Sequence, residues 1–332
     1  MFFPLDRKLK LKPYHQTTGR LERLVCEVGV RLPYEQTAAV IEKMLNVQVS
    51  GRQVEHIVDH HGRRAIEARD RAIADAWNAP APLGPQPEGP AVLYIEADGA
   101  YVNSREGLRA EGKVGLVHQG PEQIGRERQR LRSPVYVATF DGSQRLGREL
   151  YLEADRQGLE QAGQVVFLSD GAAWAREIHQ THFYDAHYVL DWYHLRRALH
   201  QTLQHAQGEL GTDYVAAVYM TLKDLLWFGE VDLTLERLDR LRRRLEGKPA
   251  RKALVDLKGY IRNNRDGIGY AGLHAQGVHI GSGPIEKAAD LVINRRCELR
   301  GMAWYRDTAN GICNLRALLL NPADRWHDFW LN

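Results

Sequence analysis

The sequence predicts an α/β protein in which a mixed sheet with flanking helices is interrupted by an all-helical insertion and preceded by a helical domain. Three observations lead to this fold class. Residues from about 15 to 78 have helical periodicity, β-type runs begin near residue 91 and then alternate with helices, and residues 195–278 are helical again. The chain has 332 residues, 44% of them hydrophobic and 26% charged, which is enough for two or three globular domains.

Composition excludes several classes of protein. Cys26, Cys297 and Cys313 are too few and too scattered for a disulfide framework, and they form no C-x-x-C pair for a zinc ribbon. No run of 18 apolar residues occurs, and the first residues carry charges within a few positions. We therefore expect a cytoplasmic protein that does not contact membranes. The net charge of +3 means that contacts to nucleic acid must come from local basic patches.

Residues 32–62 predict a helix, a short turn and a second helix that Ser50 can cap. This is the pattern of a helix-turn-helix, whose second helix would present four side chains to the major groove of DNA: Arg52, Gln53, His56 and His60. A plain helical hairpin fits the pattern equally well. The prolines and glycines of residues 78–90 predict a linker, so we assign residues 1–85 to a helical DNA-binding domain and linker.

The β-type runs predict five strands. The first three follow one another closely and are expected to be antiparallel, at residues 91–98, 113–118 and 133–140. Two more apolar strands alternate with helices, at residues 164–170 and 186–191. We assign residues 86–194 to the first part of the sheet domain.

The remaining third of the chain is expected to be helical. Residues 195–278 form the insertion, and arginines and lysines concentrate between Leu235 and Arg265. A leucine repeat gives this basic segment a packing side, so a solvated helix face explains it as well as a nucleic-acid site does. A last helix is expected from Pro284 to Leu320, followed by an apolar plug at Trp326–Trp330, and residues 279–332 complete the sheet domain.

Two aspartates each end an apolar strand and precede a glycine: Asp98 in IEADG and Asp170 in FLSDG. Asp-Gly is also a common turn dipeptide, and Asp141 in FDG is an example without an implied catalytic role. Side chains at strand ends of a mixed sheet can converge, and Glu286 adds a third carboxylate after the sequence Gly-Ser-Gly-Pro. We expect Gly283 to be the N-cap of that helix and Glu286 to lie at N3.

Three carboxylates without a thiolate suit hard cations such as Mg²⁺. Two such ions about 3.5–4 Å apart can contact the attacking and leaving oxygens of an in-line phosphoryl transfer. The sequence therefore predicts that Asp98, Asp170 and Glu286 hold two Mg²⁺ or Mn²⁺ ions.

Several motifs resemble those of bacterial DDE transposases of the Kra group of insertion sequences. PLDRKLKLKP and YEQTAAVIEKMLNVQVS resemble the family's N-terminal segment and DNA-binding helices, and LYIEADGAYV and EGKVGLV resemble its first-aspartate strand and the strand after it. VVFLSDGAAW is similar to the second-aspartate motif, HYVLDWYHLRRAL to the following strand and helix, and GSGPIEKAADLVINRRCELRGMAW to the glutamate helix. The resemblance covers most of the chain, although a cysteine-rich zinc module found in some relatives is absent from the sequence.

The resemblance implies an RNase H-like catalytic fold, with Asp98, Asp170 and Glu286 as the catalytic triad and residues 195–278 as an insertion that splits the domain. Such an enzyme cuts double-stranded DNA at the terminal repeats of a transposon, with water as the nucleophile, and joins the freed 3′-hydroxyl to target DNA. The resemblance also implies a homodimer that brings two transposon ends together at the bacterial nucleoid. Two alternatives are a domesticated protein that only binds DNA and an RNase H-like nuclease specific for DNA structure.

The same motifs suggest further contacts to DNA. Asp191 and His194 form a D-x-x-H element similar to one that positions DNA or the active site in related transposases; capping of a helix by Asp191 is the alternative. Three arginines that follow Glu286 can hold phosphates beside the metal ions or be solvated charges: Arg295, Arg296 and Arg300. Trp304 can stack on an unpaired base or belong to the core.

Overall fold

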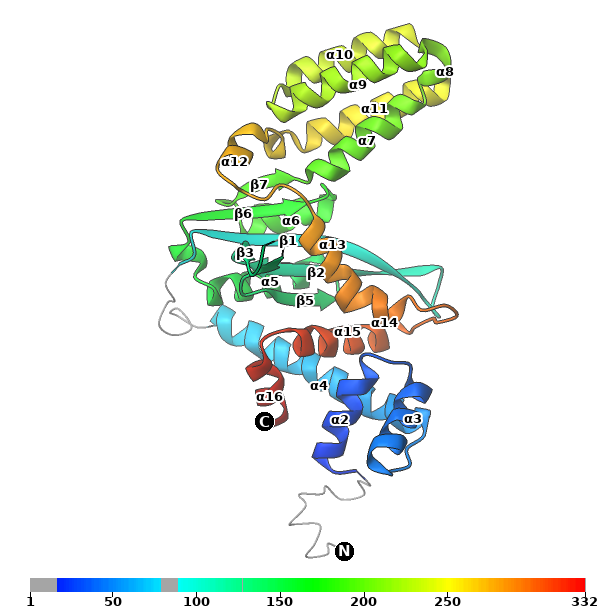
Figure 1. Cartoon of the computed structure of the whole chain (residues 1–332), viewed down its shortest axis with the longest axis vertical. Coiled ribbons are helices and arrows are strands. Elements are labelled where there is room, and N and C mark those ends of the chain that lie inside the picture. The colour runs from blue at the N-terminus through cyan, green and yellow to red at the C-terminus, as the bar shows by residue number, and fades with distance from the viewer. Residues whose placement is uncertain (1–16, 79–88, 127, 332) are drawn as a thin grey trace, which may run out of the picture.

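The computed structural model describes residues 17–78, 89–126 and 128–331. The predicted N-terminal segment at residues 4–13 and most of the predicted linker lie outside these residues. The centre of the molecule is a five-stranded sheet of order β5-β2-β1-β6-β7, with helices on both faces (Figure 1). The predicted α/β class with a mixed sheet is therefore confirmed.

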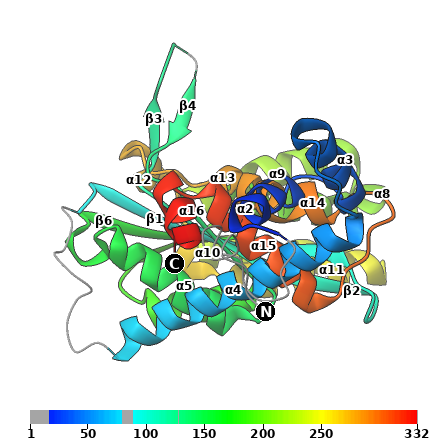
Figure 2. The same cartoon turned by 90° about the horizontal axis from the view of Figure 1, so that it is seen from below.

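The five expected strands are present. The first three are antiparallel neighbours, β1 (Val92–Asn103), β2 (Arg109–His118) and β5 (Val135–Thr139). The last two run parallel to β1, namely β6 (Gln164–Ser169) and β7 (His187–Leu190). A small hairpin between β2 and β5 was not predicted, because its strands are only three residues long and mostly polar: β3 (Pro121–Gln123) and β4 (Gln129–Leu131). Figure 2 shows this hairpin projecting from the body of the protein.

The sequence pattern predicted that strand β1 ends at Asp98, but the strand does not end there. It continues through Gly99 to Asn103, because β2 pairs with it along this whole length, from Tyr94 opposite His118 to Asn103 opposite Arg109. The Asp-Gly pair at residue 98 is therefore part of a strand and makes no turn. The shorter neighbour β6 does end at this level, since Ala97 of β1 is paired with Ser169.

The two faces of the sheet pack against different helices. Leu93, Ile95 and Ala97 of β1 belong to a core with α5 (Ser143–Arg156) and α6 (Ala173–His182). The short helix η1 (Leu159–Gln161) lies between α5 and β6 in the chain. The alternate residues of β1 point to the other face, where α13 (Gly283–Ala289) crosses the sheet (Figure 1). The predicted alternation of β1 thus separates its hydrophobic core side from the side that carries Glu96 and Asp98.

The N-terminal helices are α2 (Gly19–Gly29), α3 (Tyr34–Leu45) and α4 (Gly51–Asn78). Ser50 starts α4 with a capping box: Gln53 N donates to Ser50 Oγ (3.2 Å), and Ser50 N donates to Gln53 Oε1 (2.8 Å). Helix α4 then runs beside α15 (Arg306–Leu320) beneath the sheet (Figures 1 and 2). The two helices meet at Gly62 and Gly311, where a Cβ on Gly62 would lie 2.8 Å from the Gly311 Cα. The N-terminal helices therefore share one core with the sheet domain.

Two asparagines of α15, Asn310 and Asn314, and Asn321 directly after the helix cover the outer edge of β5. Asn310 Oδ1 accepts from Phe140 N (3.0 Å), and Asn314 Nδ2 donates to Ala138 O (3.2 Å). Asn321 forms two bonds with Tyr136, accepting from its N–H (2.7 Å) and donating to its carbonyl (3.0 Å). An uncovered strand edge can pair with another chain, so these side chains both satisfy and protect β5.

The helices between β7 and α13 form a bundle that stands beyond β7 in Figure 1. They are α7 (Trp192–Gln204), α8 (Gln207–Leu210), α9 (Thr212–Trp227), α10 (Val231–Arg244) and α11 (Lys248–Asn263), followed by η2 (Arg265–Gly267) and α12 (Ala271–Ala275). The predicted packing side of the basic segment is confirmed, because Leu238, Leu241 and Leu245 are buried in the bundle core. Most of its arginines and lysines are exposed on the opposite side.

The C-terminal part differs from the single helix predicted from Pro284 to Leu320. Helix α13 passes into a π-helical turn, η3 (Asp290–Asn294), and a short α14 (Arg295–Cys297). The chain then turns at Gly301, whose φ is +82°, and pairs with the end of β1 through Trp304 N and Asn103 O (2.9 Å). The last helix, α16 (Ala323–Leu331), buries Trp326, which confirms the predicted apolar plug.

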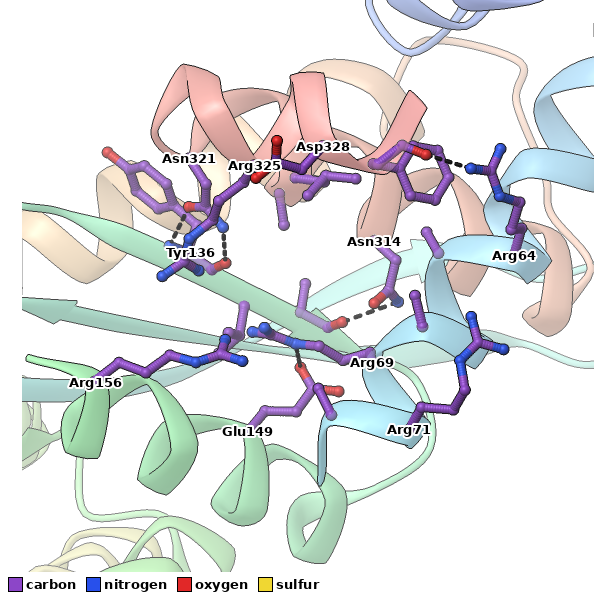
Figure 3. A pocket seen from close by; sticks show the side chains of 18 of the residues that line it. Arg64, Arg69, Arg71, Tyr136, Glu149, Arg156, Asn314, Asn321, Arg325 and Asp328 are labelled. Carbon is purple, nitrogen blue, oxygen red and sulfur yellow. Dashed lines mark hydrogen bonds and ion pairs between the residues drawn. The ribbon is translucent and has the colours of Figure 1, made fainter. Parts of the chain in front are cut away.

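An ion-pair network joins α4, α5 and α16 around a cavity of about 680 Å³ (Figure 3). Five arginines line this cavity: Arg64, Arg69, Arg71, Arg156 and Arg325. Three of them donate to the fully buried Glu153, with Arg156 at 3.0 Å, Arg325 at 2.7 Å and Arg69 closer still. Burial alone would raise the pKa of Glu153, but these arginines lower it to about 2. The network therefore stabilises the helix packing while Glu153 is ionised.

We expect Glu153→Gln to lower the free energy of unfolding at pH 7 by about 3 kcal/mol, because it removes the buried carboxylate that three arginines share as their acceptor. The carboxyl titrates near pH 4.5 when unfolded and near pH 2 when folded, so the difference from wild type should shrink as the pH falls below 4.5. Urea unfolding followed by tryptophan fluorescence measures it. The exposed Glu160→Gln is the control; equal stability of Glu153→Gln and wild type at pH 7 would contradict the prediction.

Candidate functional site

Three aspartates lie at the same level on neighbouring strands, within β1 and just after the ends of β6 and β7. Ala97 of β1 is paired with Ser169 of β6, and Ser169 is paired with Leu190 of β7. The next residue along each strand is an aspartate: Asp98, Asp170 and Asp191. Because the three strands are parallel and in register, these carboxylates follow the sheet at one level. The row was only partly predicted, since Asp191 was considered with His194 and not with the other two aspartates.

Two buried carboxylates hold the start of α13. Ser282 N donates to Asp191 Oδ1 (3.2 Å), and Ile285 N donates to Glu96 Oε2 (3.2 Å). The first N–H groups of a helix have no acceptor within the helix, and a carboxylate is a favourable partner for them. Asp191 and Glu96 are both fully buried, so these bonds fix where the helix begins.

Glu96 is itself held by a histidine of the neighbouring strand. Gly120 N donates to His118 Nδ1 (3.0 Å), so the ring proton lies on Nε2, which donates to Glu96 Oε1 (2.9 Å). The His118 ring stacks on Tyr94, with centroids 4.9 Å apart. The Tyr94 hydroxyl accepts from His279 N (3.1 Å), so the same side of the sheet also positions the loop before α13.

The helix start differs by one residue from the prediction. Ser282, not Gly283, is the N-cap, and Glu286 N donates to the Ser282 carbonyl (2.9 Å). The Ser282 hydroxyl also donates to Glu286 Oε1 (2.8 Å). The capping serine thus orients the carboxylate of Glu286 back toward the strand ends.

Asp191, His194 and Glu286 each place one possible ligand atom within 4.8 Å of the others. Asp191 is also the N-cap of α7, because Tyr193 N (2.9 Å) and His194 N (3.3 Å) donate to it, and His194 Nδ1 is in hydrogen-bond contact with Asp191 Oδ2. The capping alternative for the D-x-x-H element is therefore observed, and the same residues also lie beside Glu286.

Electrostatic interactions connect these groups with the first two aspartates. Burial is the main cause that raises the pKa of Asp98 to about 6; the charges of Asp170 and Glu286 also raise it, while the N–H of Gly99 and the charge of His194 lower it. The hydrogen bond to Asp191 raises the pKa of His194, with help from the charges of Asp170 and Glu286. Burial opposes ionisation of Asp191, but hydrogen bonds from His194, Ser282 and the Tyr193 N–H hold its pKa below the usual range.

Asp98, Asp170, Asp191, His194 and Glu286 thus form one group of interacting charges, which we call the carboxylate cluster. Within the described residues, the ligand atoms close enough to share one ion are those of Asp191, His194 and Glu286. Two hydrogen bonds fix Asp170. Its Oδ1 accepts from the nearby Ala172 N (2.9 Å), and its carbonyl accepts from the hydroxyl of the distant Tyr260 (2.6 Å). Tyr260 belongs to α11, so the helical bundle contacts the cluster directly. Carboxylate oxygens are the ligands that Mg²⁺ and Mn²⁺ prefer, whereas the imidazole of His194 is more typical of a site for Zn²⁺ or another transition metal.

The predicted DNA-contacting residues of α4 lie on its first turns. Arg52 and His56 are exposed, as is His60 one turn further on. Gln53 is exposed too, but the capping box already uses its side-chain oxygen. Contact of Arg52 and His56 with DNA stays a prediction, whereas Gln53 contributes to the helix start.

The sequence pattern wrongly placed Arg296 on the surface, and of the two roles considered for Trp304 the structure confirms the core role. Arg296 is fully buried, and Trp304 is 7% exposed, with its Nε1 donating to Cys297 O (3.0 Å). The π-helical turn η3 changes the phase of the helix before Arg296, and the turn at Gly301 carries Trp304 back to β1. Trp304 thus belongs to the core. Arg295, ion-paired with Asp290 (3.0 Å), and Arg300 are exposed.

Sequence reasoning missed Glu96 and the position of Asp191 in the row. A signal existed for both: Asp191 ends an apolar strand as Asp170 does, and Glu96 shares the strand face of Asp98. Which helix start meets Glu96 depends on contacts between distant segments, so its partner could not be predicted from local pattern.

Residues 3–330 match the profile of an uncharacterised protein family, UPF0236. The chain belongs to this family. No curated protein is significantly similar to it. Among the helices of the described residues, none has both the length and the apolar character that crossing a bilayer requires.

We expect Asp98→Asn to raise the free energy of unfolding of the metal-free protein at pH 8, by about 2 kcal/mol at most, because the raised pKa means that ionised Asp98 destabilises the fold. A group with a raised folded pKa stabilises below its unfolded pKa of 3.8 and loses that contribution as the pH rises through about 6. The variant and wild type should therefore differ little near pH 4. Urea unfolding in EDTA at both pH values is the measurement.

The exposed Asp185→Asn serves as the matched control, with no pH-dependent difference expected. If Asp98→Asn were less stable than wild type at pH 8, the carboxylate would be stabilising there and the prediction would be wrong.

Proposed function

We propose that the protein is a DNA transposase of the DDE class with an RNase H-like catalytic domain, in which Asp98, Asp170 and Glu286 hold two divalent ions. The observation that carries this proposal is that Asp98 and Asp170 follow paired residues of β1 and β6, while Glu286 of α13 adds its charge to that of Asp170 at Asp98. Their negative charges raise the pKa of Asp98 beyond the effect of burial, as expected where a cation is the missing partner.

The fold supports the same proposal. A mixed sheet carries the two aspartates on adjacent parallel strands, a helical bundle separates them in sequence from the glutamate helix, and that helix returns across the sheet (Figure 1). This is the arrangement that the resemblance to the Kra-group transposases implies for an RNase H-like domain split by an insertion. The side-chain chemistry agrees, since hard cations prefer carboxylate oxygens.

Bound Mg²⁺ or Mn²⁺ would supply the charge that stabilises the transferring phosphate and activates water or a 3′-hydroxyl. The protein's own residues perform the remaining tasks. Asp98 and Asp170 are fixed by backbone N–H groups, and Glu286 by Ser282. His194 uses Nδ1 for Asp191, so Nε2 is the atom that can donate to a phosphate oxygen of DNA.

The proposed DNA contacts outside the cluster come from exposed basic side chains. Arg52 and His56 lie at the exposed start of α4, and Arg295 and Arg300 follow the glutamate helix. Such groups bind phosphates independently of sequence, so their contribution should weaken with salt. We further propose that two copies of the protein act together, since transposition joins two transposon ends.

We expect Asp98→Asn, Asp170→Asn and Glu286→Gln each to reduce metal-dependent cutting of duplex DNA carrying the transposon ends by at least about a hundredfold, while duplex binding is retained. Each substitution removes one negative charge, so too little negative charge remains to hold the ions, although the side chain keeps its shape. Gel assays of cutting and of strand transfer into a plasmid, with Mg²⁺ or Mn²⁺, measure both steps. Asp141→Asn, in an Asp-Gly pair outside the cluster, should retain activity.

Three results would overturn the proposal in different ways. Binding without cutting in either metal would indicate a protein that only binds DNA. Cutting without joining would indicate a structure-specific nuclease. Cutting that survives in all three triad variants would place the chemistry elsewhere.

A further inference from the structure

A second cavity, of about 610 Å³, lies away from the carboxylate cluster. It forms where the starts of α3 and α4 meet the loop after α14 and the tip of the β1–β2 hairpin. Figures 1 and 2 show α3 beside α14 in this region. The lining includes Arg296 and Tyr34 in its depth and two exposed arginines, Arg52 and Arg105.

Arg296 is a fully buried cation without a carboxylate partner among the described residues. Its Nε donates to Gly29 O (3.0 Å), and its Nη1 has only a weak contact with Met302 Sδ (3.6 Å). The guanidinium lies between the rings of Tyr34 and Trp304, 4.9 Å from each centroid. These cation–π contacts stabilise the charge and hold the plane of the group, but Nη2 has no hydrogen-bond partner among the described residues.

The Tyr34 hydroxyl is a second hydrogen-bond donor that lines this cavity. It is buried and, within the described part of the chain, unpaired. Burial raises the pKa of Tyr34 far above its usual value, so the group remains an O–H donor. Two buried donors without acceptors that line one cavity indicate that an acceptor from outside the chain completes them.

Arg316 shows that this core can satisfy a buried arginine. It is 7% exposed and also lacks a carboxylate, yet its Nε donates to Leu291 O (3.0 Å), and Nη1 and Nη2 donate to the carbonyls of Val30 and Leu291. The unpaired Nη2 of Arg296 is thus specific to its position at the cavity.

The charge around the cavity favours an anion. Arg52, Arg105 and Arg296 line it together with Glu35 and Glu55, which leaves an excess of one positive charge. Arg105 is held over the mouth by a bond from its Nε to Ala303 O (3.1 Å) and by contact with the Tyr305 ring. Guanidinium groups match the oxygens of phosphate in geometry as well as charge.

We propose that this cavity binds a phosphate group, with Arg296 Nη2 and the Tyr34 hydroxyl donating to its oxygens and with Arg52 and Arg105 balancing its remaining charge. The site goes beyond the proposed transposase activity and does not depend on the metal-binding carboxylates. Free phosphate and a phosphate of a nucleic-acid strand present the same oxygens, so the test includes both.

Thermal unfolding of the full-length protein in sodium phosphate and in sodium chloride, at equal ionic strength, tests the proposal. Phosphate should raise the Tm of wild type, since a ligand of the folded state stabilises it. Arg296→Met should abolish this rise, and Tyr34→Phe should weaken phosphate affinity about threefold to tenfold by removing one hydrogen bond. Arg316→Met, with a lower starting Tm, should retain the rise.

A short oligonucleotide with a 5′-phosphate, compared with the same strand ending in a 5′-hydroxyl, separates the sources. A stabilisation that needs Arg296 and is confined to the 5′-phosphorylated strand indicates a strand terminus; one given by both strands indicates internal phosphates; one given by inorganic phosphate alone indicates a free anion. Each supports the site. An equal Tm in phosphate and chloride without any effect of the strands, or a rise that persists in Arg296→Met and Tyr34→Phe, would overturn it, whatever the cutting assay shows.

Discussion

The position of Glu286 depends on the hydrogen bonds that Glu96 and Asp191 accept from the start of α13. These bonds join residues 189 and 91 positions apart in the chain. Each uses a backbone N–H that the helix itself cannot satisfy, so the helix start and the buried carboxylates need one another. His118 completes the arrangement from β2, because it orients Glu96 from the other side. One set of polar contacts thus places a helical carboxylate beside Asp191 and His194.

Burial of Asp98, together with the nearby charges of Asp170 and Glu286, raises its pKa, so the ionised form of Asp98 is disfavoured in the fold. Contacts away from the carboxylate cluster stabilise the fold. Asparagines of the α15 region cover the edge of β5, and Glu153 joins three helices through arginines. Ligand-binding sites commonly combine a group of unfavourable charges with a stable surrounding fold. The helical bundle also takes part, since Tyr260 bonds to the backbone of Asp170.

The sequence allowed the strands, most helices and the three carboxylates to be predicted, because apolar alternation and Asp-Gly after a strand are local patterns. The row formed with Asp191 required strand register, which depends on pairing between distant segments. Arg296 was misplaced, and the two roles of Trp304 were left open, for a related reason. A π-helical turn and a glycine with positive φ break the helical phase between Glu286 and α15, and only tertiary contacts with β1 and α3 reveal where the side chains then lie.

Anomalous diffraction from crystals soaked in Mn²⁺ measures most directly whether these carboxylates share divalent ions. We expect anomalous peaks bounded by the side chains of Asp98, Asp170 and Glu286, with Glu96 and Asp191 still bonded to the start of α13. Peaks confined to other parts of the surface, or a Glu286 side chain turned away from the two aspartates in the presence of the ion, would contradict the metal site on which the proposed function rests.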